Sequence, residues 1–219
     1  MQTVGVAILA GLAAWHAAST RGWWRAVLFA GLGLGVGAAG EYVATSVVPT
    51  VRHHTRPRLG RVPVGAVLSW YAITYAAFDS VERSLGPRRG TWPRVLGTAL
   101  VATSLDLLLD VFGLAMGLWE LRQDGTYARE IVGPNGRRGV PLGNFVAWPL
   151  MTGGTVAVYL RLTGPLAPSG RLGRGGLVLL GYYLPAARWA VRRGRRRYLA
   201  YSALAPLTAL WGALGATRR

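Results

Sequence analysis

The sequence predicts an all-α fold, a polytopic transmembrane helix bundle of about six or seven membrane helices. Three observations support this prediction. Hydrophobic residues make up 52% of the 219-residue chain and recur in long runs along its whole length. Charged residues make up only 15%, whereas soluble proteins usually carry roughly 25%. Those charges lie mainly in the short loops between the apolar runs. We therefore expect residues 1–219 to form a single integral membrane domain.

A bilayer core requires about 20 apolar residues per helix. Segments near this length lie at about 3–19, 25–51, 62–82, 95–120, 141–162, 175–191 and 198–214. The first has no basic residue before Arg21, so we interpret it as a membrane helix that stays attached rather than a secretory signal. The last two are barely long enough to cross, because an arginine run at 192–197 separates them. A re-entrant or interfacial helix is the alternative there.

The net charge of +17 comes from 25 basic residues, all arginine, spread over several loops and ends. No single basic face emerges, so we expect contact with membrane lipids and no nucleic-acid partner. Alternating sides carry 14 and 11 arginines, the larger number in the loops at 52–61, 122–138 and 188–197. This small difference favours a cytoplasmic N-terminus. We expect the chain in the cytoplasmic membrane of a prokaryote.

Glycine pairs at four-residue spacing predict closely packed helices. These pairs are Gly31 with Gly35, Gly33 with Gly37, and Gly113 with Gly117. Cysteine is absent from the sequence, which excludes disulfides and thiol chemistry. Sequence motifs of serine hydrolases, P-loop nucleotide-binding proteins and zinc proteases are also absent. We expect no cofactor and no metal site.

Acidic residues are the most informative, because the chain has only eight. They are Glu41, Asp79, Glu82, Asp106, Asp110, Glu120, Asp124 and Glu130. Six lie within or at the edges of apolar segments. A carboxylate at bilayer depth costs at least about 2.5–3.5 kcal/mol to insert, so such residues are candidates for function.

Asp106 and Asp110 are spaced to lie one turn apart on one face of the fourth segment. The same polar stripe continues through Gly113 and Gly117 to Glu120. Two carboxylates this close in a low-dielectric region repel each other, so we expect one to hold a proton near neutral pH and serve as a general acid. The alternative is that arginines or hydroxyls neutralise the pair for folding alone.

Further candidates flank these acids along the chain. Glu41 lies inside the second segment, which ends near His53 and His54. The two histidines could donate protons or bind metal, but adjacent histidines point in different directions and we favour polar contacts over a metal site. Asn144 begins the fifth segment, where it either caps the helix or hydrogen-bonds a carboxyl group from the fourth segment.

Taken in order along the chain, several short motifs resemble the carotenoid biosynthesis membrane family. They are Gly40-Glu41-Tyr42, Arg52-His53-His54-Thr55 with Pro57, Gly60-Arg61-Val62-Pro63 leading to Trp70, Asp106 and Asp110 with Trp119-Glu120, and Gly139-Val140-Pro141-Leu142-Gly143-Asn144-Phe145 with Trp148. The resemblance covers about residues 40–150. That family includes carotenoid 1,2-hydratases such as bisanhydrobacterioruberin hydratase, and the related gamma-carotene 1′-hydroxylase.

The resemblance implies cofactor-independent addition of water to the terminal double bond of a linear ψ-end carotenoid, giving a tertiary alcohol. Asp106 or Asp110 would then donate the proton, and the other aspartate, Glu41 or Glu120 would accept one from water. Contacts to the polyene or to its cation would come from a further set of residues. These are His53, His54, Trp70, Tyr71, Trp119, Asn144, Phe145 and Trp148.

Two departures from the family pattern leave the substrate open. An aspartate–proline pair and a Trp-x-Trp pattern are expected near the end of the fourth segment, but the chain has Asp110-Val111 and Trp119 alone. Partners of the chain would be a lipid-soluble carotenoid and other carotenoid-pathway enzymes.

Other functions remain open on the sequence alone. A proton-initiated carotenoid cyclase would use the same first step. A membrane prenyltransferase would need a second aspartate-rich cluster. A transporter or scaffold would use the buried acids as a proton relay or as structural groups.

Overall fold

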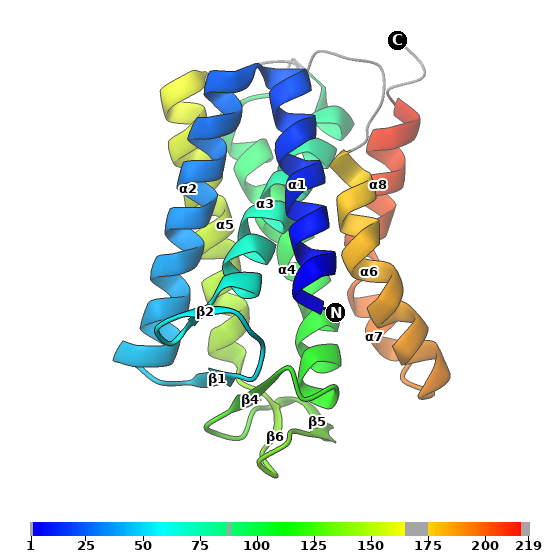
Figure 1. Cartoon of the computed structure of the whole chain (residues 1–219). Helices are drawn as coiled ribbons and strands as arrows, with labels where there is room; N and C mark the ends of the chain where they lie inside the picture. Colours follow the sequence, from blue (N-terminus) through cyan, green and yellow to red (C-terminus); the bar gives the residue numbers. More distant parts are fainter. Residues whose placement is uncertain (1, 87–88, 165–174, 216–219) are drawn as a thin grey trace.

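The computed structural model describes residues 2–86, 89–164 and 175–215. Helices dominate these residues, which confirms the all-α prediction (Figure 1). Eight α-helices are found in the described ranges: α1 Gln2–Arg21, α2 Trp23–Tyr42, α3 Val64–Leu85, α4 Thr91–Ala115, α5 Leu142–Thr163, α6 Gly175–Arg192, α7 Arg197–Tyr201 and α8 Leu204–Gly215. Four helical stretches in the described part are long and apolar enough to cross a membrane: Thr3–Arg21, Trp23–Val47, Thr91–Ala115 and Leu142–Thr163. The chain is therefore a multi-pass membrane protein.

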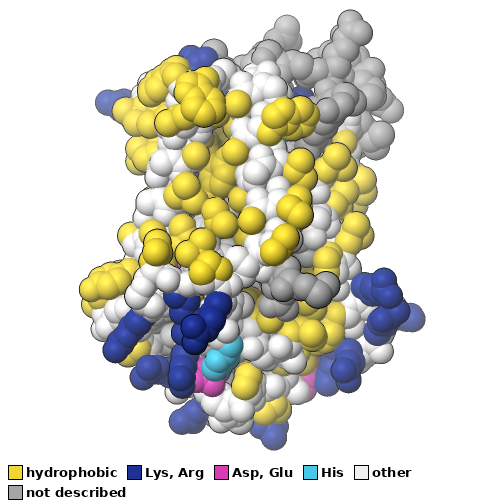
Figure 2. Space-filling model, in the orientation of Figure 1, with side chains coloured by type: hydrophobic (Ala, Val, Ile, Leu, Met, Phe, Trp, Pro, Cys, Tyr) yellow, Lys and Arg dark blue, Asp and Glu magenta, His cyan; other side chains and the backbone are white. Residues whose placement is uncertain are grey.

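Helix α3 runs through the centre of the bundle, where α1, α2, α4, α6 and α8 pack against it (Figure 1). Its residues from Tyr71 to Glu82 are buried without a break. The outer helices instead expose large apolar side chains such as Leu96, Leu150 and Leu177. Figure 2 shows apolar side chains over the flanks of the bundle and arginines gathered towards one end. Apolar side chains on the flanks and charged side chains at the ends are typical of a protein that is embedded in a lipid bilayer.

Short antiparallel ribbons close one end of the bundle, which we call the ribbon end (Figure 1). Strand β1, Val51–His53, pairs with β4, Trp119–Leu121, so that His53 lies opposite Trp119. Strand β2, Arg58–Leu59, pairs with β3, Val62–Pro63, and β5, Tyr127–Val132, pairs with β6, Arg138–Val140. These ribbons satisfy the backbone hydrogen bonds of loops that would otherwise face the membrane surface unpaired.

Several predicted helix ends are wrong, for identifiable reasons. The second segment continues from α2 as a π-helix, η1 Val43–Val47, and the chain is extended by Val51. Helix α4 ends at Ala115 because Gly117 adopts a left-handed conformation with φ 66°. The predicted polar stripe therefore ends before Glu120, which lies on β4. The predicted segment 198–214 is divided into α7 and α8.

The predicted glycine packing is confirmed only in part. Gly33 faces Tyr71, Gly37 faces Trp70 and Gly113 faces Trp119. Gly31 and Gly35 meet no neighbouring atoms, so those two glycines do not bring helices together.

Candidate functional site

Asp106 and Asp110 lie on the inner face of α4, near the ribbon end. Their exposed fractions are 3% and 9%. Both carboxyl groups meet the same Asn144 side-chain amide, so they lie side by side, as the four-residue spacing predicted. Two carboxylates this close in an apolar region repel each other, so one proton shared by the pair stabilises it.

Asn144 fixes this pair from the first turn of α5. Its side-chain Nδ2 donates to Asp110 Oδ2 and lies 3.3 Å from Asp106 Oδ2. The helix itself is capped by Pro141 without a side-chain hydrogen bond. Of the two predicted alternatives for Asn144, the structure shows the contact with the carboxyl groups and not the helix cap.

Glu41 supplies a third buried carboxyl group from the last turn of α2. Trp70 Nε1 on α3 donates to Glu41 Oε1 at 3.0 Å. His53 on β1 places Nε2 2.9 Å from Glu41 Oε2, within ion-pair distance although the two groups are not aligned as a hydrogen bond. The Glu41 carboxylate is close enough to act electrostatically on both aspartates. The structure thus brings the predicted acids of α2 and α4 into one cluster.

Close helix packing places the aromatic residues beside these acids. Gly37 lets α2 approach Trp70, because a Cβ atom at Gly37 would lie 2.8 Å from the Trp70 Cβ. The Trp70 ring stacks on Trp148 of α5, with ring centroids 3.8 Å apart. These packed rings join three helices and give the cluster an aromatic wall.

Trp119 adds a further ring from the ribbon. It folds back onto α4 at Gly113, where any side chain would collide with the ring. The centroids of Trp119 and His53 are 5.8 Å apart, as the β1–β4 pairing allows. Trp119 therefore lies beside His53, the residue that faces Glu41.

Other predicted site residues lie outside this cluster. Glu120 pairs with His54 at 3.3 Å and with Arg52 at 3.5 Å on the ribbon. Tyr71 is in the bundle core, packed against Phe29 and Tyr75.

Phe145 packs edge-on against Tyr127 of β5, with ring centroids 5.0 Å apart. Burial, followed by the nearby Tyr198, Tyr201 and Asp110, raises the pKa of the Tyr127 hydroxyl. That hydroxyl therefore stays protonated and donates to the Leu107 carbonyl oxygen at 2.9 Å. Tyr127 therefore links the β5–β6 ribbon to α4, the helix that carries the aspartate pair.

A second buried cluster at the opposite end of the bundle differs in its partners. Asp79 pairs with Arg21 at 3.0 Å and with Arg83 at 2.9 Å. Glu82 pairs with Arg21 at 2.6 Å and lies 3.4 Å from Arg94. These carboxylates are neutralised by arginine. Around Asp106, Asp110 and Glu41, by contrast, the partners that the described residues provide are an amide, an indole and an imidazole.

Sequence reasoning missed the contacts that depend on chain segments far apart. The Glu41–His53 pair arises from the turn after the π-helix, and no local spacing indicates it. The pairing of Arg21 with Asp79 and Glu82 joins residues about 60 positions apart. A usable signal was the position of these charges in the sequence: Asp79 and Glu82 lie within an apolar segment, and Arg94 directly precedes the next one. Within the described ranges, no group of three His, Asp or Glu side chains is placed to hold a metal ion.

Comparison with protein families matches residues 2–191 to a family described as carotenoid biosynthesis protein. The chain belongs to the carotenoid biosynthesis protein family. The match extends beyond both ends of the region 40–150 in which the motifs lie, and it includes every residue of the cluster. No curated protein and no solved structure matches the chain.

Proposed function

We propose that this carotenoid biosynthesis protein is a hydratase that adds water to the terminal double bond of a linear ψ-end carotenoid. The observation that carries the proposal is the buried Asp106–Asp110 pair, held by Asn144 beside Glu41 and His53 without an arginine partner among the described residues. A buried carboxyl pair that shares one proton suits acid catalysis in an apolar medium. The family and the membrane location support a lipid-soluble substrate.

The first step is protonation of the alkene. The protonated carboxyl of the Asp106–Asp110 pair donates to the less substituted carbon of the terminal double bond. A C–H bond forms, the π bond breaks and the neighbouring carbon becomes a tertiary cation. The second carboxylate and Asn144 hold the donor in place, because both contact it directly.

The cation is stabilised by charge and by aromatic faces. Loss of the proton leaves both aspartates ionised, so the negative charge of the pair rises from one to two next to the developing positive charge. Trp70 and Trp148 form a stacked aromatic pair beside Glu41, and indole faces attract cations.

Water then completes the reaction. Its oxygen attacks the tertiary cation, a C–O bond forms, and the surplus proton passes to a base. The Glu41–His53 pair is the base in this proposal, since its two facing atoms lie 2.9 Å apart and can share the proton. Transfer of that proton back to the aspartate pair restores the starting state, so the reaction consumes only the carotenoid and water. Glu120, paired with Arg52 and His54, has no part in these steps.

The test is pigment analysis by mass spectrometry in cells that accumulate lycopene or a longer ψ-end carotenoid. Expression of the chain should yield products heavier by one water per modified end, and Asp106→Asn and Asp110→Asn should abolish them. Asp124→Asn is the matched control, because Asp124 lies on the exposed ribbon and accepts only the Arg138 backbone N–H. An isomer of unchanged mass would identify a cyclase, and unchanged pigment with every substrate would contradict an enzymatic role.

A further inference from the structure

The loop that joins α6 to α7 carries the densest positive charge in the sequence. Five arginines occur between positions 192 and 197, separated only by Gly194. Arg195 is half-buried and the other four are exposed. Like charges this close repel one another, so the loop needs anions around it.

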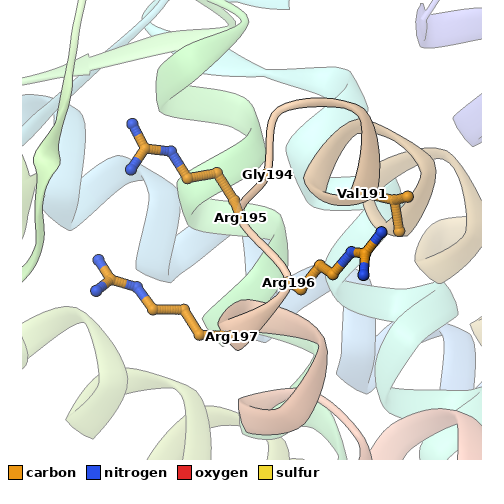
Figure 3. Close-up of a pocket in the computed structure, with 5 residues that line it drawn as sticks. All are labelled: Val191, Gly194, Arg195, Arg196 and Arg197. Carbon is orange, nitrogen blue, oxygen red and sulfur yellow. The ribbon is translucent and has the colours of Figure 1, made fainter.

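A hollow of about 390 Å³ opens at this loop, lined by Val191, Gly194, Arg195, Arg196 and Arg197 (Figure 3). Its volume is at the lower end of the about 300–1,000 Å³ usual for small-ligand sites. The side chains of Arg195 and Arg197 extend in one direction, whereas Arg196 extends towards Val191. The hollow shares no lining residue with the carboxyl cluster.

Glu130 neutralises only part of this charge. It accepts a hydrogen bond from Arg197 and lies 3.8 Å from Arg195. The Arg197 guanidinium also packs over the Tyr198 ring, 5.1 Å from its centroid. Arg196 has no acidic partner within the described part of the chain. The hollow therefore keeps a surplus of positive charge centred on Arg196.

Within the residues that the structure describes, no acid pairs with Arg196. Every charged side chain after Glu130 in the sequence is an arginine. Among the acids before it, Asp79 and Glu82 bind the arginines of the far end, Glu120 binds Arg52 and His54, and Asp124 accepts the Arg138 backbone N–H. Arg196 is therefore open to an anion from outside the chain.

We propose that this hollow binds the headgroup phosphate of an anionic phospholipid. The guanidinium fork of arginine matches two phosphate oxygens, which favours Arg196 as the main contact. Val191 of the hollow is 46% exposed, and helices α6 and α8 expose further apolar side chains, Leu184 at 60% and Leu207 at 63%. A phospholipid can place its acyl chains on this surface, whereas free phosphate cannot, so the lipid is the better fit.

Native mass spectrometry of the full chain tests this site. The protein is released from bilayers of equal parts phosphatidylglycerol and phosphatidylcholine, and the lipid that remains bound is counted. We expect phosphatidylglycerol to be retained preferentially, and Arg196→Gln to lower its retention about fivefold. Arg196→Lys, which keeps the charge but loses the fork, should fall between the two.

Arg129→Gln is the matched control, since Arg129 is an exposed arginine of the same ribbon end outside the hollow. It should retain as much phosphatidylglycerol as the unaltered protein, and millimolar inorganic phosphate should not displace the lipid. Equal losses in Arg129→Gln and Arg196→Gln, unchanged retention in Arg196→Gln, equal retention of phosphatidylcholine, or displacement by free phosphate would each overturn the proposal.

Discussion

Asp79 and Asp106 are buried aspartates on neighbouring helices, with exposed fractions of 0% and 3%. Asp79 is held between Arg21 and Arg83, which makes it a fully paired anion. Asp106 contacts Asp110 and Asn144 instead. The two aspartates thus have different surroundings: Asp79 stabilises the bundle through ion pairs, whereas Asp106 has no arginine partner among the described residues and suits the proposed proton transfer.

Replacement of either aspartate of the pair by asparagine should lower the hydration rate by about 10²- to 10⁴-fold, the usual contribution of a general acid. The fold should persist, because asparagine keeps the shape and removes a buried charge. Product formation by mass spectrometry measures the rate, and circular dichroism in detergent checks the fold. A variant that folds and retains full activity would show that the pair does not donate the proton.

Asn144→Ala tests whether this residue positions the acid. The loss of a hydrogen bond to a charged group worth about 1.5–3 kcal/mol should lower kcat about 10- to 100-fold, with little change in KM for the carotenoid. Asn135→Ala is the control, because Asn135 is exposed and donates to Leu121 on the ribbon. A rise in KM at constant kcat would instead assign Asn144 to substrate binding.

At the scale of elements, close approach of α2 to α3 positions Trp70 next to Glu41. Gly37→Ala should destabilise the protein by about 1–3 kcal/mol, because the new methyl group meets the Trp70 Cβ rather than a flexible side-chain tip. Gly35→Ala, on the same helix with open space around it, should be neutral or stabilising by up to about 1 kcal/mol. Thermal unfolding in detergent compares the two, and equal melting temperatures would contradict the packing described here.

The contact between the β5–β6 ribbon and α7 should depend on pH. Burial opposes ionisation of Glu130, but hydrogen bonds from Tyr198 and Arg197 outweigh it and lower the pKa of this carboxyl below its ordinary 4.5. A carboxyl group whose pKa is lower in the folded than in the unfolded chain stabilises the fold at pH values above its unfolded pKa. This stabilisation is lost as the pH falls through the folded pKa.

The melting temperature of Glu130→Gln should therefore be lower than that of the unaltered chain at neutral pH. The difference should shrink as the pH falls below 4.5 and disappear once the pH is below the folded pKa of Glu130. A difference that stays constant over the whole range would show that ionisation of Glu130 contributes nothing.

Local sequence patterns predicted the helices and the contact between Asp106 and Asp110 within α4. They did not predict contacts between residues that are far apart in the sequence. The four-residue spacing of Asp106 and Asp110 was sufficient to predict their contact, since it depends on helix geometry alone. Trp119 and Glu120 were predicted to lie on the fourth helix. The helix ends earlier at the left-handed Gly117, and the only sequence feature that marks this end is the glycine itself. The β1–β4 pairing that brings His53 towards Glu41 depends on tertiary structure, which no local period encodes.

At the scale of the whole molecule, the two ends of the bundle have different roles. The far end contains buried ion pairs that connect α1, α3 and α4 through Arg21, Asp79, Glu82 and Arg94. The ribbon end contains the carboxyl cluster and the arginine-rich loop. Stability and proposed chemistry are thus separated along the bundle axis.

Arg21→Met should destabilise the protein by about 3–5 kcal/mol, since two buried carboxylates lose a shared arginine whose side chain is only 4% exposed. Arg25→Met, in the first turn of α2, should cost much less, because Arg25 forms no ion pair in the part of the chain that the structure describes. Thermal unfolding measures both. Similar losses for the two variants would contradict a structural role for the Arg21 ion pairs.

The most direct test of the central claim is the origin of the atoms in the product. Purified protein in lipid nanodiscs is given a linear ψ-end carotenoid in deuterium oxide, and in a parallel reaction in water enriched in heavy oxygen. Hydration by this cluster predicts one carbon-bound deuterium and one oxygen from water at each modified end, with neither label introduced by Asp106→Asn. A hydroxyl oxygen that comes from molecular oxygen, or a product without carbon-bound deuterium, would contradict acid-catalysed hydration.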